Sequence, residues 1–390
     1  MSHDSAPPPL PAKVDLVVVG AGIVGLAHAV EAHARGHSVL VLDGAARPDG
    51  STARRSGHVA VTTQDSTALA CALASRERWL KLGRDAGFGV RESGAVVVAQ
   101  HADELAVLDD LVAARAGDAE LLDHRSVADR TPVAHAVGGV WLPLDLRLDP
   151  YAALLAICDW LSSRPQVDVA WRTAAQTFDA GSGCTLVRTS RGEVVAKRVV
   201  VAAGQAVGSL FWSAGADLTP VRRQLLRVAP PTPDDVAAQA RLASGPVVLG
   251  GTTVLRDAAY LHSRALGEVR DRWRRHRPDL LAAEIHLSLH SQADGSVVVG
   301  DGRAPADVPG RSEAVDGLLL DATAELLGTG PLTVLGRWTA TEPVRARTAP
   351  VADPFVVTEP LPGVRTVNVT DGLATTTALG LAPRVLDELF

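Results

Sequence analysis

The feature that most constrains this chain is a glycine-rich turn between a buried strand and a helix near the N-terminus. Val14–Val19 is an almost wholly apolar run, which is typical of a parallel strand buried on both faces. The turn GAGIVG follows at residues 20–25, then a helical pattern through Arg35 and a second strand, Ser38–Leu42, that ends at Asp43. This G-x-G-x-x-G turn, with an acidic residue about 20 positions later, predicts a βαβ dinucleotide-binding unit.

Each part of the turn has a physical task in binding a dinucleotide. Gly20 makes the tight turn, Gly22 lets the backbone approach a pyrophosphate, and Gly25 allows close packing of helix and strand. The helix begins at Ile23 and Val24, whose free N–H groups and partial positive charge favour phosphate. Asp43, followed by Gly44, can accept hydrogen bonds from ribose hydroxyls and disfavours the extra phosphate of NADP.

The remaining cofactor candidates lie in a loop after Asp43 and in later turns. A second dinucleotide fingerprint is absent from the sequence, and residues 50–57, GSTARRSG, instead form a small, hydroxylated and basic loop suited to phosphate and to a flat ring. Further on, Arg198–Ala202 is a strand that ends at a glycine turn, and Val364–Val369 is another buried strand that leads into a helix over Thr375–Phe390. The candidates from these segments are Ser51, Thr52, Arg54, Arg55, Ser56, Gly57, His58, Ala175, Ala203, Gly204, Gly372, Leu373, Ala374, Thr375 and Thr376.

This order of motifs resembles the D-amino-acid oxidase, glycine oxidase and sarcosine oxidase family of FAD-dependent amine oxidoreductases, over essentially the whole chain. Short stretches also resemble a bacterial subgroup associated with aminophosphonate catabolism. These stretches are residues 15–19 with 26–29, Glu92-Ser93-Gly94, Ile285-His286, Gly300-Asp301 and Arg337-Trp338.

The resemblance implies an α/β fold with a Rossmann-type FAD-binding domain and an interleaved, mixed-sheet α+β substrate domain. The FAD-binding domain would combine residues 14–91, 147–220 and 335–390, and the substrate domain residues 92–146 and 221–334. Residues 1–13 are expected to be a disordered leader. FAD is the implied cofactor, although the family commonly has a glycine where Ala374 stands.

The implied chemistry is oxidation of a C–N bond: a hydride moves from the carbon next to nitrogen to flavin N5, and water then hydrolyses the imine. A substrate with an acidic group needs a counter-charge, and the guanidinium fork matches a carboxylate or phosphonate. Arg337 is the first candidate, because in related proteins the residues at the end of this strand line the face of the flavin ring. Arg222 and Arg256 are further candidates. His290, which shares a strand face with His286, could polarise the substrate or relay a proton.

His58 lies in the region where some relatives attach FAD through a histidine, and a packed histidine is the alternative. Attachment through a cysteine near the C-terminus is excluded because no cysteine follows Cys184. The three cysteines are too few and scattered for a disulfide framework or a cysteine-based zinc site, and we expect no metal.

Composition and charge argue against nucleic acid and membrane as partners of this protein. The net charge of −6 and pI near 6.1 argue against nucleic-acid binding, and no run approaches the ~20 apolar residues that span a bilayer. The N-terminus has no cationic start or apolar core of a signal peptide, so a cytoplasmic location is expected. We expect a small amine as substrate and dioxygen as electron acceptor, while the oligomeric state stays open.

Two other functions remain compatible with the sequence. An NAD-linked dehydrogenase could use the single Rossmann fingerprint. A flavin-binding protein that has lost catalysis is suggested by the departures from the family pattern at Ala374, Thr341 and Arg55.

Overall fold

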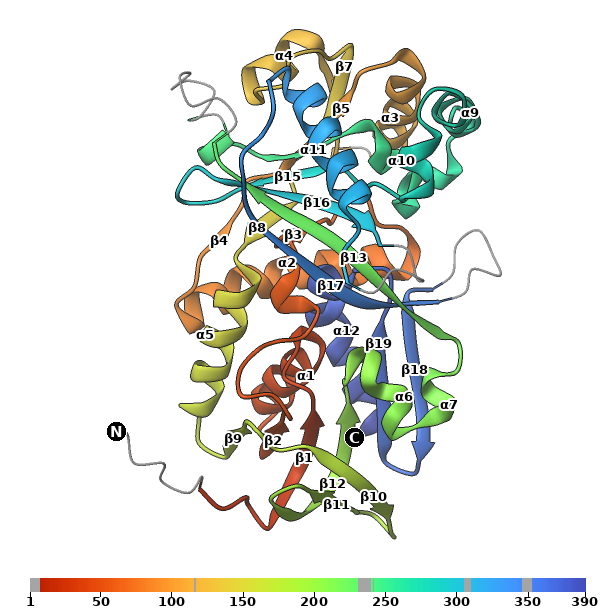
Figure 1. Cartoon of the computed structure of the whole chain (residues 1–390). Coiled ribbons are helices and arrows are strands. Elements are labelled where there is room, and N and C mark those ends of the chain that lie inside the picture. The colour runs from red at the N-terminus through yellow and green to blue at the C-terminus, as the bar shows by residue number, and fades with distance from the viewer. Residues whose placement is uncertain (1–7, 116, 231–239, 241, 305–309, 346–352) are drawn as a thin grey trace.

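The computed structural model describes residues 8–115, 117–230, 240, 242–304, 310–345 and 353–390. They form two large sheets at opposite ends of an elongated molecule, with a small three-stranded sheet between them (Figure 1). Residues 1–7 of the expected leader lie outside the described residues. Pro8 and Ala12 contact the first sheet through their carbonyl groups, which accept hydrogen bonds from Arg191 and Val195.

The first sheet confirms the expected βαβ unit. β1 (Lys13–Val19) pairs in parallel with β2 (Val39–Leu42) and with β12 (Gly192–Val201), and α1 (Ile23–Ala34) connects β1 to β2. Three antiparallel strands and two further parallel ones complete it. These are β9 (Val167–Ala170), β10 (Ala175–Ala180), β11 (Thr185–Thr189), β18 (Phe355–Leu361) and β19 (Val364–Val369).

Helices on one face of this sheet form the largest core. With α1 they are α2 (Ser66–Ala86), α5 (Pro150–Ser162) and α12 (Ala374–Leu389). α2 and α12 pack closely, since a Cβ added at Gly380 would lie 2.2 Å from the carbonyl oxygen of Cys71. The buried indole of Trp79 donates a 2.8 Å hydrogen bond to the carbonyl of Thr375 and so fixes the first turn of α12. Two short helices, α6 (Val207–Leu210) and α7 (Trp212–Gly215), pack against the core on the other face.

The second sheet is mixed, as expected for the substrate domain. In spatial order its strands are β17 (Val334–Arg345), β13 (Leu218–Val228), β16 (Val297–Arg303), β15 (Ser288–Ser291), β14 (Val247–Leu249), β5 (Ala95–Ala99), β7 (Gly138–Leu142) and β6 (Glu120–Asp123). The helices that pack on it are α3 (Ala102–Ala114), α4 (His124–Arg130), α9 (Leu266–His276), α10 (Pro278–Ala282) and α11 (Glu313–Leu327).

Short elements fill the region between the sheets. The small sheet consists of β3 (His58–Val59), β8 (Leu146–Leu148) and β4 (Val90–Arg91). The 3-10 turns are η1 (Thr52–Arg54), η2 (Gly204–Ala206), η3 (Gly251–Leu255) and η4 (Ala258–His262).

The structure moves two expected segment boundaries. Residues 335–345 were placed in the FAD-binding segment, but as β17 they pair with β13 along its whole length in the second sheet. β13 likewise begins at Leu218, ahead of the expected boundary at residue 221. The chain therefore returns to the first sheet only at β18. A strand pattern shows that a strand forms but not which sheet it joins.

We predict that His28 makes the stability of the protein depend on pH. His28 is fully buried in α1, and its Nδ1 donates to the carbonyl of Val24 at 2.7 Å. Burial lowers its pKa from 6.5 to about 4. Between these values only the unfolded chain binds the proton, so the free energy of unfolding should fall by up to about 1.4 kcal/mol per unit as the pH falls.

Urea denaturation at several pH values between 6.5 and 4 tests this for wild type and His28→Leu. The variant should show a smaller loss of stability on acidification than the wild type. Equal losses in the two proteins would mean that His28 contributes nothing to the pH dependence.

Candidate active site

A cleft of about 450 Å³ opens where the parallel strands of the first sheet end. It lies at the carboxyl ends of β1, β2 and β12, the edge where open α/β sheets bind their ligands. Most of the cofactor residues expected from the sequence line it. They are Gly20, Gly22, Ile23, Val24, Asp43, Gly44, Ser51, Thr52, Arg55, Ala175, Ala203, Gly204, Gly372, Ala374 and Thr375.

The glycine turn has the geometry that a diphosphate requires. Gly20 has φ +107°, and a Cβ at Gly25 would lie only 1.9 Å from the Gly20 carbonyl oxygen. At Gly22 a Cβ would point into open space, with its nearest neighbour, Thr52 Oγ1, at 3.7 Å. Gly22 provides no side-chain cap for α1, and the N–H of Ile23 makes only a long hydrogen bond of 3.4 Å to Thr52 Oγ1, so the N-terminus of the helix can bind phosphate.

Asp43 is held in position by the turn that it faces. Its two carboxylate oxygens accept hydrogen bonds from the N–H groups of Ala21 and Ala45, each at 2.8 Å. Each oxygen has a second lone pair for a ribose hydroxyl. The acidic residue and the glycine turn therefore form one rigid unit at the edge of the cleft.

Asn368 on β19 is a lining residue that the sequence analysis missed. Its side chain is buried, and neither amide atom has a hydrogen-bond partner among the described residues. An unpartnered buried polar group costs about 1–3 kcal/mol, so a ligand with both donors and acceptors fits this position. The sequence does carry one signal for this residue, because Asn368 is a polar residue between two apolar ones in the expected buried strand. The cleft thus suits a nucleotide cofactor such as FAD.

Several expected cofactor residues do not line this cleft. Arg54 turns outward to Asp49, while Gly57 packs under the carbonyl of Leu148. The others are Gly25, Ser56, His58, Leu373 and Thr376.

A buried ion cluster borders the cleft on the side of the second sheet. Arg55 Nη1 lies 2.9 Å from Glu342 Oε2, Arg223 Nε lies 3.0 Å from Glu342 Oε1, and Arg256 Nη1 lies 2.8 Å from Asp301 Oδ1. We call these five residues the arginine cluster. It carries three positive and two negative charges.

Burial and ion pairing act in opposite directions on the charges of the arginine cluster. Burial alone would lower the pKa of Arg256, but Asp301 and Glu342 raise it above its ordinary value. Burial likewise opposes the ionisation of Asp301, but Arg256, Arg55 and Arg223 hold its pKa below the ordinary value. Arg256 and Asp301 therefore stay charged at neutral pH.

The arginine cluster reaches the cofactor cleft at Gly372. This glycine has φ +76°, and a Cβ on it would lie 2.6 Å from Arg55 Nη2 and 2.9 Å from Glu342 Oε2. Arg55 and Glu342 themselves line the cleft. Next to Gly372, Ala374 and Thr375 begin α12, whose N-terminus has no side-chain cap.

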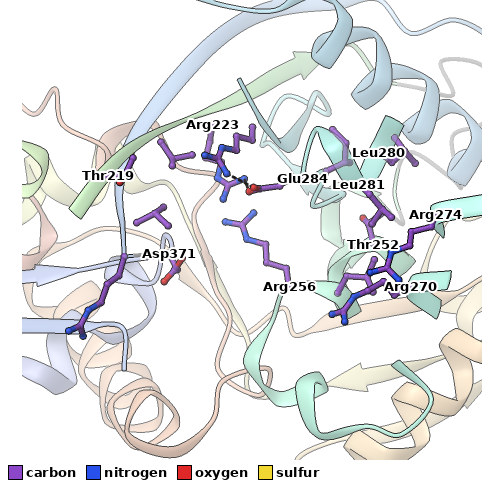
Figure 2. A pocket seen from close by; sticks show the side chains of 16 residues that line it. Thr219, Arg223, Thr252, Arg256, Arg270, Arg274, Leu280, Leu281, Glu284 and Asp371 are labelled. Atoms are coloured by element: carbon purple, nitrogen blue, oxygen red, sulfur yellow. Dashed lines mark hydrogen bonds and ion pairs between the residues drawn. The ribbon is translucent and has the colours of Figure 1, made fainter. Parts of the chain in front are cut away.

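A second cavity, of about 560 Å³, opens on the other side of the arginine cluster. Figure 2 shows Arg223, Arg256 and Glu284 pointing toward one another, with Asp371 to one side and Arg270 and Arg274 of α9 to the other. Glu284 accepts a 3.0 Å hydrogen bond from Arg223 Nη1. The cavity is rich in arginine and thus suited to acidic ligands.

The structure separates the three arginines that the sequence singled out for the substrate. Arg256 lies in the arginine cluster, between the two cavities. Arg337 instead points to the opposite face of its sheet, where its Nε lies 3.2 Å from Asp316 on α11. Its neighbour Trp338 faces the cofactor loop and donates to the carbonyl of Arg54 at 2.9 Å. Arg222 alternates with Arg223 along β13 and lines neither cavity.

The two singled-out histidines lie close together between the sheets. The His58 and His290 rings are 5.7 Å apart. His58 Nε2 lies 2.8 Å from Asp145 Oδ2, and His290 Nε2 lies 3.0 Å from Ser288 Oγ. Asp145 is fully buried and was not anticipated, because it stands in a loop without a motif.

Neither a metal site nor a membrane span is found in the described part of the chain. Within it, no three His, Cys, Asp or Glu side chains are grouped to hold a metal ion. No helix there has the length and apolar character needed to cross a bilayer.

Comparisons with known proteins identify the fold and the cofactor class. A family model described as FAD dependent oxidoreductase matches residues 15–384. A search among curated protein sequences gave no match. Three solved structures are similar at low identity, a level that shows the fold alone. They are glycine oxidase from Geobacillus kaustophilus (16% identity, 97% of this chain and 95% of that chain covered, TM-score 0.72), iminodiacetate oxidase from Chelativorans sp. BNC1 (18%, 96% and 94%, 0.69), and FAD-bound L-alpha-glycerophosphate oxidase from Mycoplasma pneumoniae (16%, 96% and 95%, 0.71).

We predict that Gly22→Val gives a folded protein without FAD. The backbone at Gly22 has an ordinary φ of −74°, and no protein atom blocks a side chain there, so the fold should tolerate the change. The new side chain would occupy the space of the diphosphate. Flavin content of the purified protein and its circular dichroism measure the two effects. Gly89→Val, at a position equally open, is the control and should keep its flavin.

We predict that Asn368→Leu weakens cofactor binding without destabilising the apoprotein. The substitution removes an unpartnered buried amide, so the apoprotein should be as stable as wild type or more so. The Kd for FAD should rise roughly tenfold, as expected for one lost hydrogen bond of about 1.4 kcal/mol.

Thr366→Val on the same strand is the matched control. Its hydroxyl is already bonded to Thr358 Oγ1 at 2.7 Å, so this variant should lose stability while retaining FAD affinity. Unchanged FAD affinity in Asn368→Leu would contradict the assigned contact.

Proposed function

Because the chain belongs to the family of FAD-dependent oxidoreductases, we propose that it oxidises the C–N bond of a small amine bearing an acidic group. The observation that carries this proposal is the arginine cluster, which places three guanidinium groups and two carboxylates at the edge of the cofactor cleft. Family membership also assigns the single dinucleotide fingerprint to FAD rather than NAD.

The residues that would hold FAD follow from the cleft. The α1 N-terminus and Gly22 take the diphosphate, Asp43 takes the ribose, and the loop at Thr52 and Arg55 supports the ring end. FAD supplies the hydride acceptor. The uncapped N–H groups at Ala374 and Thr375 would direct the positive end of the α12 dipole toward bound FAD and so stabilise negative charge on it.

The arginine cluster would bind the acidic group and so orient the amine. Arg256 is the principal contact, because it borders the second cavity and forms part of the cluster. Asp301 and Glu342 fix the direction of its guanidinium and keep it charged. A carboxylate or phosphonate bound there would accept hydrogen bonds from the guanidinium group, which favours acidic over neutral amines.

Short sequence stretches and the similar solved structures bear on which acidic amine is the substrate. The short stretches resembling the aminophosphonate subgroup favour an aminophosphonate, such as 2-aminoethylphosphonate or an N-methylated form. Ordinary amino acids are the alternative, and similar structures include oxidases of glycine and of iminodiacetate. We propose dioxygen as the electron acceptor.

A substrate screen tests the proposed function. Anaerobic mixing of the yellow protein with aminophosphonates, sarcosine, glycine and D-amino acids should bleach the flavin for at least one acidic amine. Hydrogen peroxide release in air then tests the acceptor. A protein that binds FAD but is bleached by no amine would instead be a catalytically silent flavin-binding protein.

We predict that Arg256→Lys raises the KM for the best acidic amine roughly 10- to 100-fold while FAD stays bound. Lysine keeps the charge beside Asp301 but loses the guanidinium fork, a loss of about 1.5–3 kcal/mol for a charged hydrogen bond. Steady-state kinetics and flavin content measure the two effects. Arg337→Met serves as the comparison, and a larger rise in KM in that variant would place the acidic group on the opposite face of β17.

A further inference from the structure

An aspartate–histidine pair, Asp145 and His58, lies beside the cofactor cleft and has no role in the proposed function described above. Asp145 Oδ1 accepts hydrogen bonds from the N–H groups of Val61 and Thr62, at 2.9 and 3.1 Å. Its Oδ2 lies 2.8 Å from His58 Nε2. A carboxylate that receives backbone donors acts as an acceptor, so the imidazole proton lies on Nε2 and Nδ1 is left with a lone pair.

The free nitrogen of His58 is open to a ligand. Within the described part of the chain, Nδ1 has no hydrogen-bond partner, and it is not among the buried unpartnered atoms. The side chain as a whole keeps 8% exposure, whereas Asp145 has none. This geometry combines a sealed carboxylate with an accessible imidazole nitrogen, the arrangement that orients a general base.

His58 does not line the cofactor cleft, but its neighbours in the sequence place it beside the cleft. Arg55, three residues earlier, lines the cleft. The N–H of Ala60, two residues later, donates a 3.2 Å hydrogen bond to Thr376 Oγ1, next to the lining residue Thr375. His290 lies on the other side, on β15 of the second sheet, so His58 stands between the cleft and that sheet.

His290 stays neutral and cannot compete for a proton. Ser288 Oγ donates to the carbonyl of Gly300, so His290 Nε2 must donate to Ser288, and His290 Nδ1 is a bare acceptor. Burial lowers the pKa of His290 well below its usual value, and a proton on His58 and the charge of Arg147 would lower it further.

Other charged groups around the histidines disfavour a cationic amine. Arg55, Arg147 and His286 all add positive potential at His290, and Arg147 is the direct cross-strand neighbour of His58. Asp145 is the negative partner of His58. The positive charges in this region disfavour a cationic ammonium beside them, and a proton transferred from it to His58 would be paired with Asp145.

We propose that His58 is the base that takes the proton from the substrate ammonium group, with Asp145 as its positioning residue. This inference rests on the proposed function, since it requires an amine substrate. An N–H bond of the ammonium breaks, its proton moves to His58 Nδ1, and the electron pair stays on nitrogen. That pair would then be available to form the C=N bond when the adjacent carbon gives up its hydride, which bound FAD would accept.

The proposal makes a specific prediction about pH. Ammonium groups have a pKa of about 8 to 10, so below this range the substrate carries a proton that must be removed before hydride loss. Above it the amine arrives neutral and needs no base. Loss of the base should therefore cost most at neutral pH and least at high pH, whereas a merely structural defect would be the same at every pH.

The experiment compares wild type, His58→Gln and Asp145→Asn with a matched control. Glutamine can still donate to Asp145, which preserves the local structure. The control is His262→Gln, an exposed histidine that also pairs with an aspartate, Asp65, at 2.8 Å. All proteins are first assayed for FAD content, and the rate of anaerobic flavin reduction by the best amine from the screen is then measured from pH 6.5 to 10.

The expected result is a loss of about 10²-fold in His58→Gln at pH 7 that shrinks to less than about tenfold near pH 10. Asp145→Asn should show the same trend, and the control should match wild type. Equilibrium binding gives a readout without turnover, using a substrate analogue with methyl groups in place of the hydrogens next to nitrogen. Its Kd, followed by the flavin spectrum, should depend more steeply on pH in His58→Gln than in wild type.

The experiment distinguishes a wrong assignment of the base from a wrong proposed function. If an amine bleaches the wild type but His58→Gln loses the same factor at every pH, or loses nothing, the base assignment is wrong and the proposed function stands. If no amine bleaches the wild type, the proposed function fails and the base assignment fails with it.

Discussion

The parallel pairing of β1 with β2 and β12 is the constraint on which the rest of the site depends. It sets Val19 level with Leu42 on one side and with Val201 on the other. The turn is then locked by backbone bonds, from Gly20 N to Leu42 O at 2.7 Å and from Ala202 N to Val19 O at 2.8 Å. This register brings the glycine turn, Asp43 and the β12 turn to one edge, where together they form a dinucleotide cleft.

The arginine cluster joins this edge to the second sheet. Ion pairs with buried carboxylates add little net stability, because desolvation offsets most of their attraction, whereas removing one arginine leaves a buried carboxylate without a partner. Their role is better understood as positional: Glu342 on β17 fixes Arg55 of the cofactor loop and Arg223 of β13 at the same time. The proposed binding site for an acidic group is thereby preorganised next to the cofactor cleft.

The local motifs could be predicted because each is contiguous in sequence. The βαβ unit, the loop at residues 50–57 and the start of α12 all lie at the expected places. Most of their residues line the cleft. A strand, turn and helix in succession fix their own geometry, so spacing alone was sufficient.

Contacts that depend on which face of a sheet a side chain points to, or on which strands pair, could not be predicted from the sequence. Arg337 and Trp338 are adjacent, and β17 points them to opposite faces, so a shift of one residue decides which meets the cofactor. Asp145 meets His58 only because β8 pairs with β3. Asn368 could have been noticed as a polar residue at a buried position, but its missing partners are visible only in three dimensions.

A crystal structure of the FAD-bound protein with a non-oxidisable acidic amine would test the central claim most directly. We expect the diphosphate at the turn over residues 20–25, the acidic group on Arg256 and the nitrogen within hydrogen-bond distance of His58 Nδ1. An amine bound near Arg337, or a cofactor outside the cleft at the ends of β1, β2 and β12, would contradict the proposed site.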